Sequence, residues 1–267
     1  MTSAVGRVLC ATVFIGCWPV EAGAQTAPLP AVARGDETGF LTRGAFFVSL
    51  AGIETADPRF STVQRSRADL DLGAYPKGRI NLFFDGEFVM GSERRRFDLD
   101  QGNFIVETSA SYRIGSLELT GVVHHESRHV VDRPSDRVVA WHTIGARVTQ
   151  AYTIGPSALA VTLDYGHVVQ STFVDYRWTS QLTLRYERPI ADAAHLFATG
   201  SGGLVGVNEL IANRDTQAGA RFEAGVRLPG AHAAADLFSA YERRLDGYPT
   251  SRQPSSWFEI GFRLGTP

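Results

Sequence analysis

Cysteine is nearly absent from this chain: Cys10 and Cys17 are the only two in 267 residues. Both lie in the first 24 residues, so a chain that loses this segment has no thiol and cannot be held together by disulfides. Long apolar runs are missing as well. No internal stretch approaches the roughly 20 apolar residues that a spanning helix needs, and a helical membrane protein is therefore not expected.

An excess of one charge is also lacking. The chain has 26 basic and 28 acidic residues, which gives a net charge of −2. The cluster Arg94-Arg95-Arg96 is short and is followed by Asp98 and Asp100, so we assign it to a solvated loop. Because no long basic run occurs, the sequence predicts no nucleic-acid partner.

The N-terminus has the three parts of a secretory signal peptide. Arg7 supplies the positive start, Val8 to Trp18 is apolar, and Ala22-Gly23-Ala24 before Gln25 fits the small-residue cleavage rule. We predict a signal peptide over residues 1–24. A lipoprotein signal through Phe14-Ile15-Gly16-Cys17 is the alternative.

Residues 25–43 contain prolines and small residues that cannot bury enough surface to fold alone, which predicts a flexible periplasmic leader. From Phe46 onward, apolar and polar residues alternate, as in strands with one apolar face. In residues 218–228, for example, Phe222, Val226 and Leu228 share one face with alanines, whereas the other face carries arginine, glutamate and glycine. Twelve such segments are centred near 46–52, 66–74, 79–90, 103–113, 116–129, 138–152, 157–167, 176–188, 195–206, 217–228, 232–243 and 256–264.

The links between these segments alternate in length. Short, turn-like links such as Ile114-Gly115 and Gly155-Pro156 alternate with longer polar ones such as Val130 to Arg137 and Arg244 to Ser255. An even strand number with short turns on one side and long loops on the other is typical of bacterial outer-membrane barrels. We therefore predict an all-β fold over residues 44–267, a transmembrane antiparallel β-barrel of about twelve strands, with ten as the alternative.

A soluble β-sandwich or lipocalin-like barrel would also alternate. Two features favour the membrane barrel. One face carries opposite charges at nearby positions, as a narrow polar lumen requires: Arg221 with Glu223, Arg185 with Glu187, and Glu259 with Arg263. The other face carries aromatic residues near strand ends, as expected where strands meet lipid head groups: Tyr176, Trp178, Tyr186, Tyr241 and Phe258.

The densest group of reactive side chains is His124-His125-Glu126-Ser127-Arg128-His129, with Asp132 beyond it. Strand parity continues the apolar face through His125, Ser127 and His129, and it directs His124, Glu126 and Arg128 inward. The segment lies about ten residues from its periplasmic turn, near the outer leaflet. Lipopolysaccharide and phospholipid are the substrates expected there.

The next strand adds His142 on the same outward face, and symmetric pairing would place it across from His125. A histidine beside a serine is the minimum for a base-activated nucleophile, and a carboxylate orients the ring. The candidate catalytic residues are His125, Ser127, His129, Asp132 and His142, with Asp136 as a second candidate acid. The competing interpretation is a polar strand end that marks the membrane interface.

Two other site types were weighed. His125, His129 and His142 could share a metal, but no tight ligand motif is present and we predict no metal or cofactor. A channel would use inward charges to set its selectivity, although side chains can also fill a twelve-stranded lumen. The inward charges are Asp69, Asp71, Asp85, Glu87, Glu107 and Arg185.

The motif His125-x-Ser127-x-His129-x-x-Asp132 resembles the strand end of an uncharacterised group of Gram-negative outer-membrane barrels. Its first part is similar to the His-x-Ser of outer-membrane lipid A deacylases, which implies a lipid-facing histidine and serine completed by a glutamate about a dozen positions later. Val139 and Ala140 stand near that position here, and no asparagine follows Ser127. The deacylases also have fewer strands.

From this sequence we expect a monomeric outer-membrane barrel with a structural or envelope role, in contact with membrane lipid and lipopolysaccharide. A lipid A or phospholipid hydrolase acting at the outer leaflet is the first alternative, and a narrow channel is the second.

Overall fold

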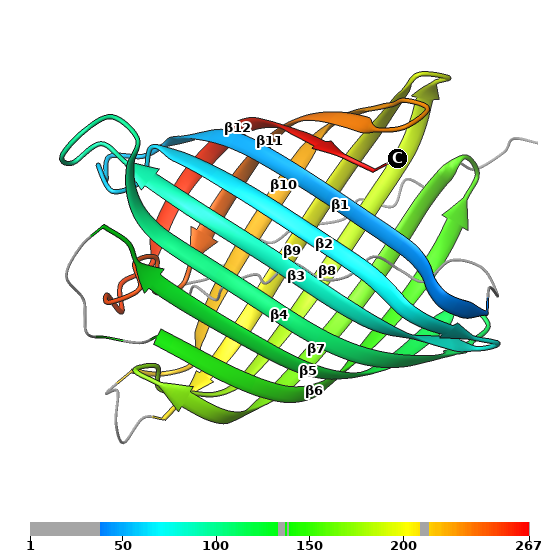
Figure 1. Ribbon diagram of the computed structural model, residues 1–267, viewed down its shortest axis with the longest axis horizontal. Helices are drawn as coiled ribbons and strands as arrows, with labels where there is room; N and C mark the ends of the chain where they lie inside the picture. Colours follow the sequence, from blue (N-terminus) through cyan, green and yellow to red (C-terminus); the bar gives the residue numbers. More distant parts are fainter. Residues whose placement is uncertain (1–37, 133–136, 138, 209–213, 267) are drawn as a thin grey trace, which may run out of the picture.

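The computed structural model describes residues 38–132, 137, 139–208 and 214–266. Twelve antiparallel strands form one sheet, which closes because β1 (Gly39–Glu54) pairs with both β2 (Thr62–Tyr75) and β12 (Ser255–Gly265). Figure 1 shows β1 and β12 side by side at this seam. The other strands are β3 (Gly78–Gly91), β4 (Asp98–Ile114), β5 (Leu117–Val130), β6 (Val139–Ile154), β7 (Ser157–Thr172), β8 (Tyr176–Ala191), β9 (Ala194–Val207), β10 (Gln217–Pro229) and β11 (Ala234–Arg244). The predicted twelve-stranded antiparallel barrel is confirmed.

The links alternate as the sequence predicts. Two-residue links join β2 to β3, β4 to β5, β6 to β7 and β8 to β9, and we call their side of the barrel the turn end. Gly115 and Gly155 have positive φ angles of 62° and 58° there, which glycine adopts without strain. Most links at the opposite side, the loop end, are longer. The two ends lie at the right and the left of Figure 1.

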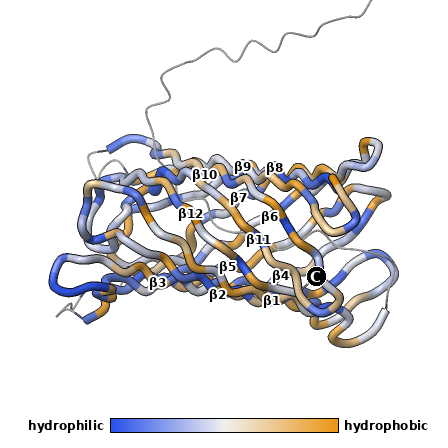
Figure 2. The backbone as a smooth tube through the Cα atoms, turned by 90° about the horizontal axis from the view of Figure 1, so that it is seen from above, coloured by the Kyte–Doolittle hydropathy of each residue, from blue (hydrophilic) through white to orange (hydrophobic). Residues whose placement is uncertain are grey.

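The alternation along each strand separates an apolar outer surface from a polar interior, and Figure 2 shows apolar and polar residues following one another along the strands. Large apolar side chains are exposed on the outside, among them Val48, Leu50, Leu119, Val123, Ile144, Leu163, Leu182, Leu184, Leu204, Phe222 and Phe262. An apolar surface of this extent is unfavourable in water and matches the hydrocarbon of a bilayer. No helix in the described part of the chain has the length and hydropathy to span a membrane.

Several boundaries differ from the prediction. The strands have 11 to 17 residues, longer than the ten that a tilted span requires. β1 begins at Gly39, inside the expected leader, because Arg43 turns inward and binds Asp69 and Asp71 at 2.6 and 2.9 Å. β4 begins at Asp98, where a loop was predicted as far as Gly102. The signal peptide and residues 25–37 of the leader lie outside the described residues.

One predicted orientation is wrong. Tyr176 was expected on the lipid side, but it is buried inside the loop end, where its ring packs edge-on against Trp141 at 5.2 Å. The register between β8 and β9 shifts between Tyr176 and Trp178. A bulge of this kind changes the parity of the residues beyond it, so the simple alternation from Trp178 does not extend to Tyr176.

Candidate functional site

The outward histidines meet as predicted. His125 on β5 and His142 on β6 are direct partners in the strand register, and their ring centroids lie 4.5 Å apart at an angle of 35°. Nδ1 of His125 is buried and has no hydrogen-bond partner among the described residues. The two rings therefore form a tilted pair in contact on the outer wall, close to the loop end.

The remaining candidates lie around this pair without completing a triad. Ser127 is half-buried on the same face, opposite Phe104 on one side and Ala140 on the other. His129 packs its ring 5.8 Å from that of Phe104. Asp132 is directed elsewhere, since its carboxylate is bound by Arg95 at 3.0 Å. The second candidate acid, Asp136, lies outside the described residues.

The inward members of the same segment also take their predicted direction. His124 lies between two carboxylates, with Nδ1 3.4 Å from Glu107 and Nε2 3.8 Å from Glu126. Arg128 is fully buried and donates to the carbonyl oxygen of Asp246 at 2.6 Å. Parity alone thus placed these three charged residues in the lumen, although it gave no partner for them.

Ion pairs inside the lumen join adjacent strands and also strands that are not neighbours in the sheet. Arg65 on β2 binds Glu87 on β3 and Glu259 on β12, both at 2.8 Å. Arg244 on β11 reaches Glu87 at 2.5 Å and Glu242 at 2.8 Å. These contacts form a lattice of arginines and carboxylates that braces one side of the barrel from within, and charges removed from water need such partners.

The lattice corrects the partners inferred from the sequence. Arg221 does bind Glu223, at 2.8 Å. Glu259, however, binds Arg65 and Arg221, while Arg263 binds Glu223 and Asp236 at 2.6 and 3.1 Å. Glu187 contacts His195 and Arg227. Pairing between strands prevails because inward side chains of adjacent and next-but-one strands converge in a closed barrel. The neighbouring strands are not visible in a single segment of sequence.

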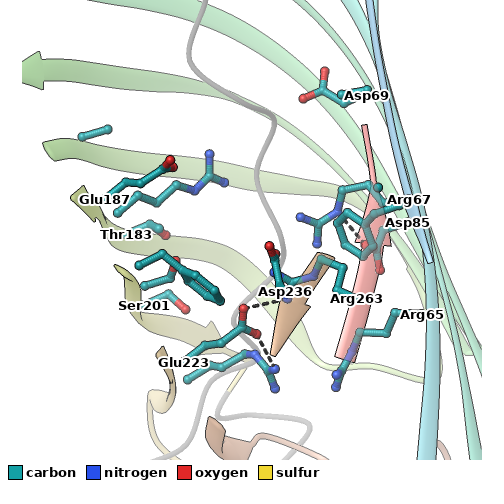
Figure 3. Close-up of a pocket in the computed structure, with 18 of the residues that line it drawn as sticks. Arg65, Arg67, Asp69, Asp85, Thr183, Glu187, Ser201, Glu223, Asp236 and Arg263 are labelled. Atoms are coloured by element: carbon teal, nitrogen blue, oxygen red, sulfur yellow. Dashed lines mark hydrogen bonds and ion pairs between the residues drawn. The ribbon is translucent and has the colours of Figure 1, made fainter. Parts of the chain in front are cut away.

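A chamber of about 1070 Å³ occupies the lumen from the turn end as far as Arg244, at the loop-end limit of β11. Figure 3 shows its two walls, with Arg65, Arg67 and Asp85 on one side and Thr183, Ser201 and Glu187 on the other. The first wall belongs to the lattice, and the second is formed largely by hydroxyl and amide groups of β8 and β9. Five of the six inward charges proposed for a channel line this chamber or are buried beside it, namely Asp69, Asp71, Asp85, Glu87 and Arg185.

The link between β11 and β12 fills the lumen at the loop end. We call residues 245–249 the plug segment. Leu245 is 0% exposed and belongs to an apolar cluster with Val139, Trp141, Tyr176, Val205, Val207 and Ala218. A second cluster beside it contains Phe60, Val63, Val89 and Trp257. Sequence reasoning missed this feature, although an apolar Leu245 and Tyr248 inside an otherwise polar link were the available signal.

Polar contacts fix the plug segment to three other elements. The carboxylate of Asp246 accepts hydrogen bonds from the hydroxyl of Tyr176 at 2.7 Å and from Arg214 at 2.7 and 2.9 Å. Arg214 also binds Asp175. Burial opposes the charge of Arg214, but the hydrogen bonds to Asp246 and Asp175 outweigh it and raise the pKa of the guanidinium above its ordinary value. Arg214 therefore keeps its positive charge between Asp246 and Asp175 at the loop end.

Comparisons with known proteins give the fold. No protein-family model matches the chain, and no curated protein matches it either. An outer membrane channel from Pseudomonas putida F1 aligns with a TM-score of 0.57 and 10% identity, over 88% of this chain and 99% of the other. Outer membrane phospholipase A from Escherichia coli aligns with a TM-score of 0.54 and 11% identity, over 84% and 92% of the two chains. The calcium-bound phospholipase from Salmonella typhi gives 0.53 and 12%, over 84% and 90%.

At these identities the likeness concerns the fold. The structure adds a closed sheet, an apolar outer surface and a charged interior. The first residues of β1 and the last residues of β12 both lie at the turn end. The chain is a transmembrane β-barrel of the outer-membrane type, located in the outer membrane.

Proposed function

We propose that this chain is a non-enzymatic barrel with a structural role in the envelope, monomeric and surrounded by outer-membrane lipid and lipopolysaccharide. The observation that carries the proposal is the cross-bracing of the lumen. Arg65, Arg244 and Glu87 join strands from opposite sides of the seam, and the plug segment adds an apolar core at the loop end. Charges that serve catalysis or transport are usually left accessible, whereas these are used to hold the wall.

The test compares strains that lack the chain with strains that carry it. Loss of the chain is expected to raise the permeability of the envelope to a large antibiotic or dye. Both the unaltered protein and the Ser127→Ala variant are expected to restore the barrier equally. Restoration by the unaltered protein alone would contradict a purely structural role.

A second function, hydrolysis of lipid acyl esters, is favoured by one specific observation. The tilted pair of His125 and His142 lies on the lipid side, with Ser127 one outward position further along β5. In this candidate Ser127 attacks the ester carbonyl while His125 accepts its proton and His142 orients the ring of His125. His125 then gives the proton to the departing alcohol as the ester bond breaks, and water hydrolyses the acyl group from Ser127 to release the fatty acid. The likeness in fold to outer membrane phospholipase A is consistent with it. Among the described residues, no carboxylate is hydrogen-bonded to His125.

Mass spectrometry of the envelope lipids tests this second function. Strains with the unaltered chain and with Ser127→Ala are compared for acylation of lipopolysaccharide and for lysophospholipid. Ser239→Ala is the matched control, because Ser239 also lies on the outer wall, on β11, where it is exposed. Hydrolysis requires a difference at Ser127 and none at Ser239, and identical lipids in all strains remove the enzyme.

A further inference from the structure

The chamber and the plug segment occupy successive parts of one lumen. The chamber is lined at the turn end by Arg43, Tyr152 and Ala234, and toward the loop end by Glu87, Glu242 and Arg244. Arg244 directly precedes Leu245, so the lining of the chamber ends where the plug segment begins. The plug segment therefore lies between the chamber and the opening of the barrel at the loop end.

The plug segment is held by a small number of identifiable contacts. Its apolar anchor is Leu245, and its main polar anchor is the carboxylate of Asp246, which receives Tyr176 and Arg214. Arg128 adds hydrogen bonds to the carbonyl oxygens of Asp246 and Gly247 at 2.6 and 3.4 Å. Contacts concentrated on one carboxylate can be lost together, which is how a two-state element is built.

The backbone of the segment is also strained. Asp246 has a φ angle of 45°, in the left-handed region that few residues other than glycine adopt. Such a conformation persists only where surrounding contacts impose it. The hydrogen bonds from Tyr176 and Arg214 help to hold Asp246 in this conformation in the lumen.

We infer that residues 245–249 are a gate, and that their displacement opens the lumen to the passage of ions and small polar solutes. This activity goes beyond the proposed structural role, which concerns the closed barrel. The chamber lining carries eight arginines and eight carboxylates, so the open lumen has no net charge of one sign to select by. We expect cations and anions to pass with similar ease.

Planar-bilayer recordings of the purified, folded barrel test the gate. The unaltered protein is expected to give few or no current steps. Asp246→Ala removes the contacts from Tyr176 and Arg214 and is expected to raise the frequency of open events by about ten- to a hundred-fold, since each hydrogen bond to a charged group favours the closed state. The reversal potential in a KCl gradient is expected to stay near zero.

Asp132→Ala is the matched control, because it removes an aspartate from another link at the loop end, which binds Arg95 and makes no hydrogen bond or ion pair with the plug segment among the described residues. It is expected to remain silent. If Asp246→Ala does not fold, Tyr176→Phe replaces it in the recordings, because it deletes only one hydroxyl. This variant is expected to give an intermediate increase in the frequency of open events. Folding is checked by the altered electrophoretic migration of unheated barrels.

The outcomes separate this inference from the proposed function. Folded Asp246→Ala and Tyr176→Phe variants that stay as silent as the unaltered protein overturn the gate and leave the structural role intact. Frequent current steps from the unaltered protein, unchanged in the variants, overturn the gate as well and contradict the closed structural barrel. Uptake of small sugars but not of larger ones by vesicles that contain Asp246→Ala supports the gate independently.

Discussion

Arg244 on β11 and Glu87 on β3 meet across the lumen, with Nη1 of the arginine 2.5 Å from Oε1 of the glutamate. Their strands are separated in the sheet by β2, β1 and β12. This ion pair thus spans the seam where the first and last strands close the barrel. Arg65 binds the same glutamate and adds Glu259 of β12, so this seam is held from inside as well as by its backbone hydrogen bonds.

The first prediction follows from this bridge. Glu87→Ala removes the carboxylate that Arg65 binds at 2.8 Å and Arg244 binds at 2.5 Å, so that Glu242 is left as their shared partner. It is expected to lower the free energy of unfolding by about 3–5 kcal/mol, as for other broken buried pairs. Adding Arg244→Ala is expected to recover part of the loss. Urea unfolding in lipid vesicles measures both variants. The exposed pair of Arg95 and Asp132 is the control, for which removal of Asp132 is expected to cost about 0–1 kcal/mol.

The second prediction concerns the outer wall of β8. Leu184 and Ile190 are both exposed on that wall, Leu184 near the middle of the strand and Ile190 next to the turn. A charge in the hydrocarbon centre is far less favourable than one at the interface. Leu184→Arg is expected to cost about 2–4 kcal/mol and Ile190→Arg about 0–1 kcal/mol. Equal costs at the two positions, measured by unfolding in vesicles, would place this wall away from lipid.

The third prediction tests a close contact on β9. A Cβ at Gly206 would lie 2.0 Å from Nε1 of Trp178, whereas one at Gly202 would meet nothing nearer than 3.8 Å. Gly206→Ala is expected to displace the indole ring and to destabilise the barrel by about 1–3 kcal/mol. Gly202→Ala is expected to be neutral or slightly stabilising. Thermal unfolding and tryptophan fluorescence distinguish them, and an unchanged spectrum for Gly206→Ala would contradict the contact.

The fourth prediction is a pH dependence at the loop end. The hydrogen bond from Arg59 holds the pKa of Asp57 below its usual value, against a smaller opposing effect of burial. A carboxylate with a lowered pKa contributes stability above its unfolded pKa of about 3.9, and this contribution is lost as the pH falls through the lowered value. The difference in unfolding free energy between the unaltered chain and Asp57→Asn is therefore expected to shrink on acidification. A difference that stays constant down to strongly acidic pH would exclude this pair as its source.

The sequence by itself determined the architecture, because a side chain in a strand can point in only two directions. The alternation of apolar and polar residues was enough to predict an all-β barrel, the even strand number and the outward face of His125 and His142. The alternation of short and long links between segments predicted a turn end and a loop end of the barrel. Where the prediction failed, at Tyr176, a register shift had changed the parity locally.

Only the tertiary structure decided which residues meet across the lumen. The partners of Glu259 and Glu87 come from strands far away in the chain, and their choice depends on the closure and tilt of the whole barrel. The same holds for the plug segment, because the partners of Leu245 and Asp246 are Trp141, Tyr176 and Arg214, which lie far away in the chain and meet only in the closed barrel. A local pattern specifies the direction of a side chain, whereas its partner is specified by the closed shape that all twelve strands make together.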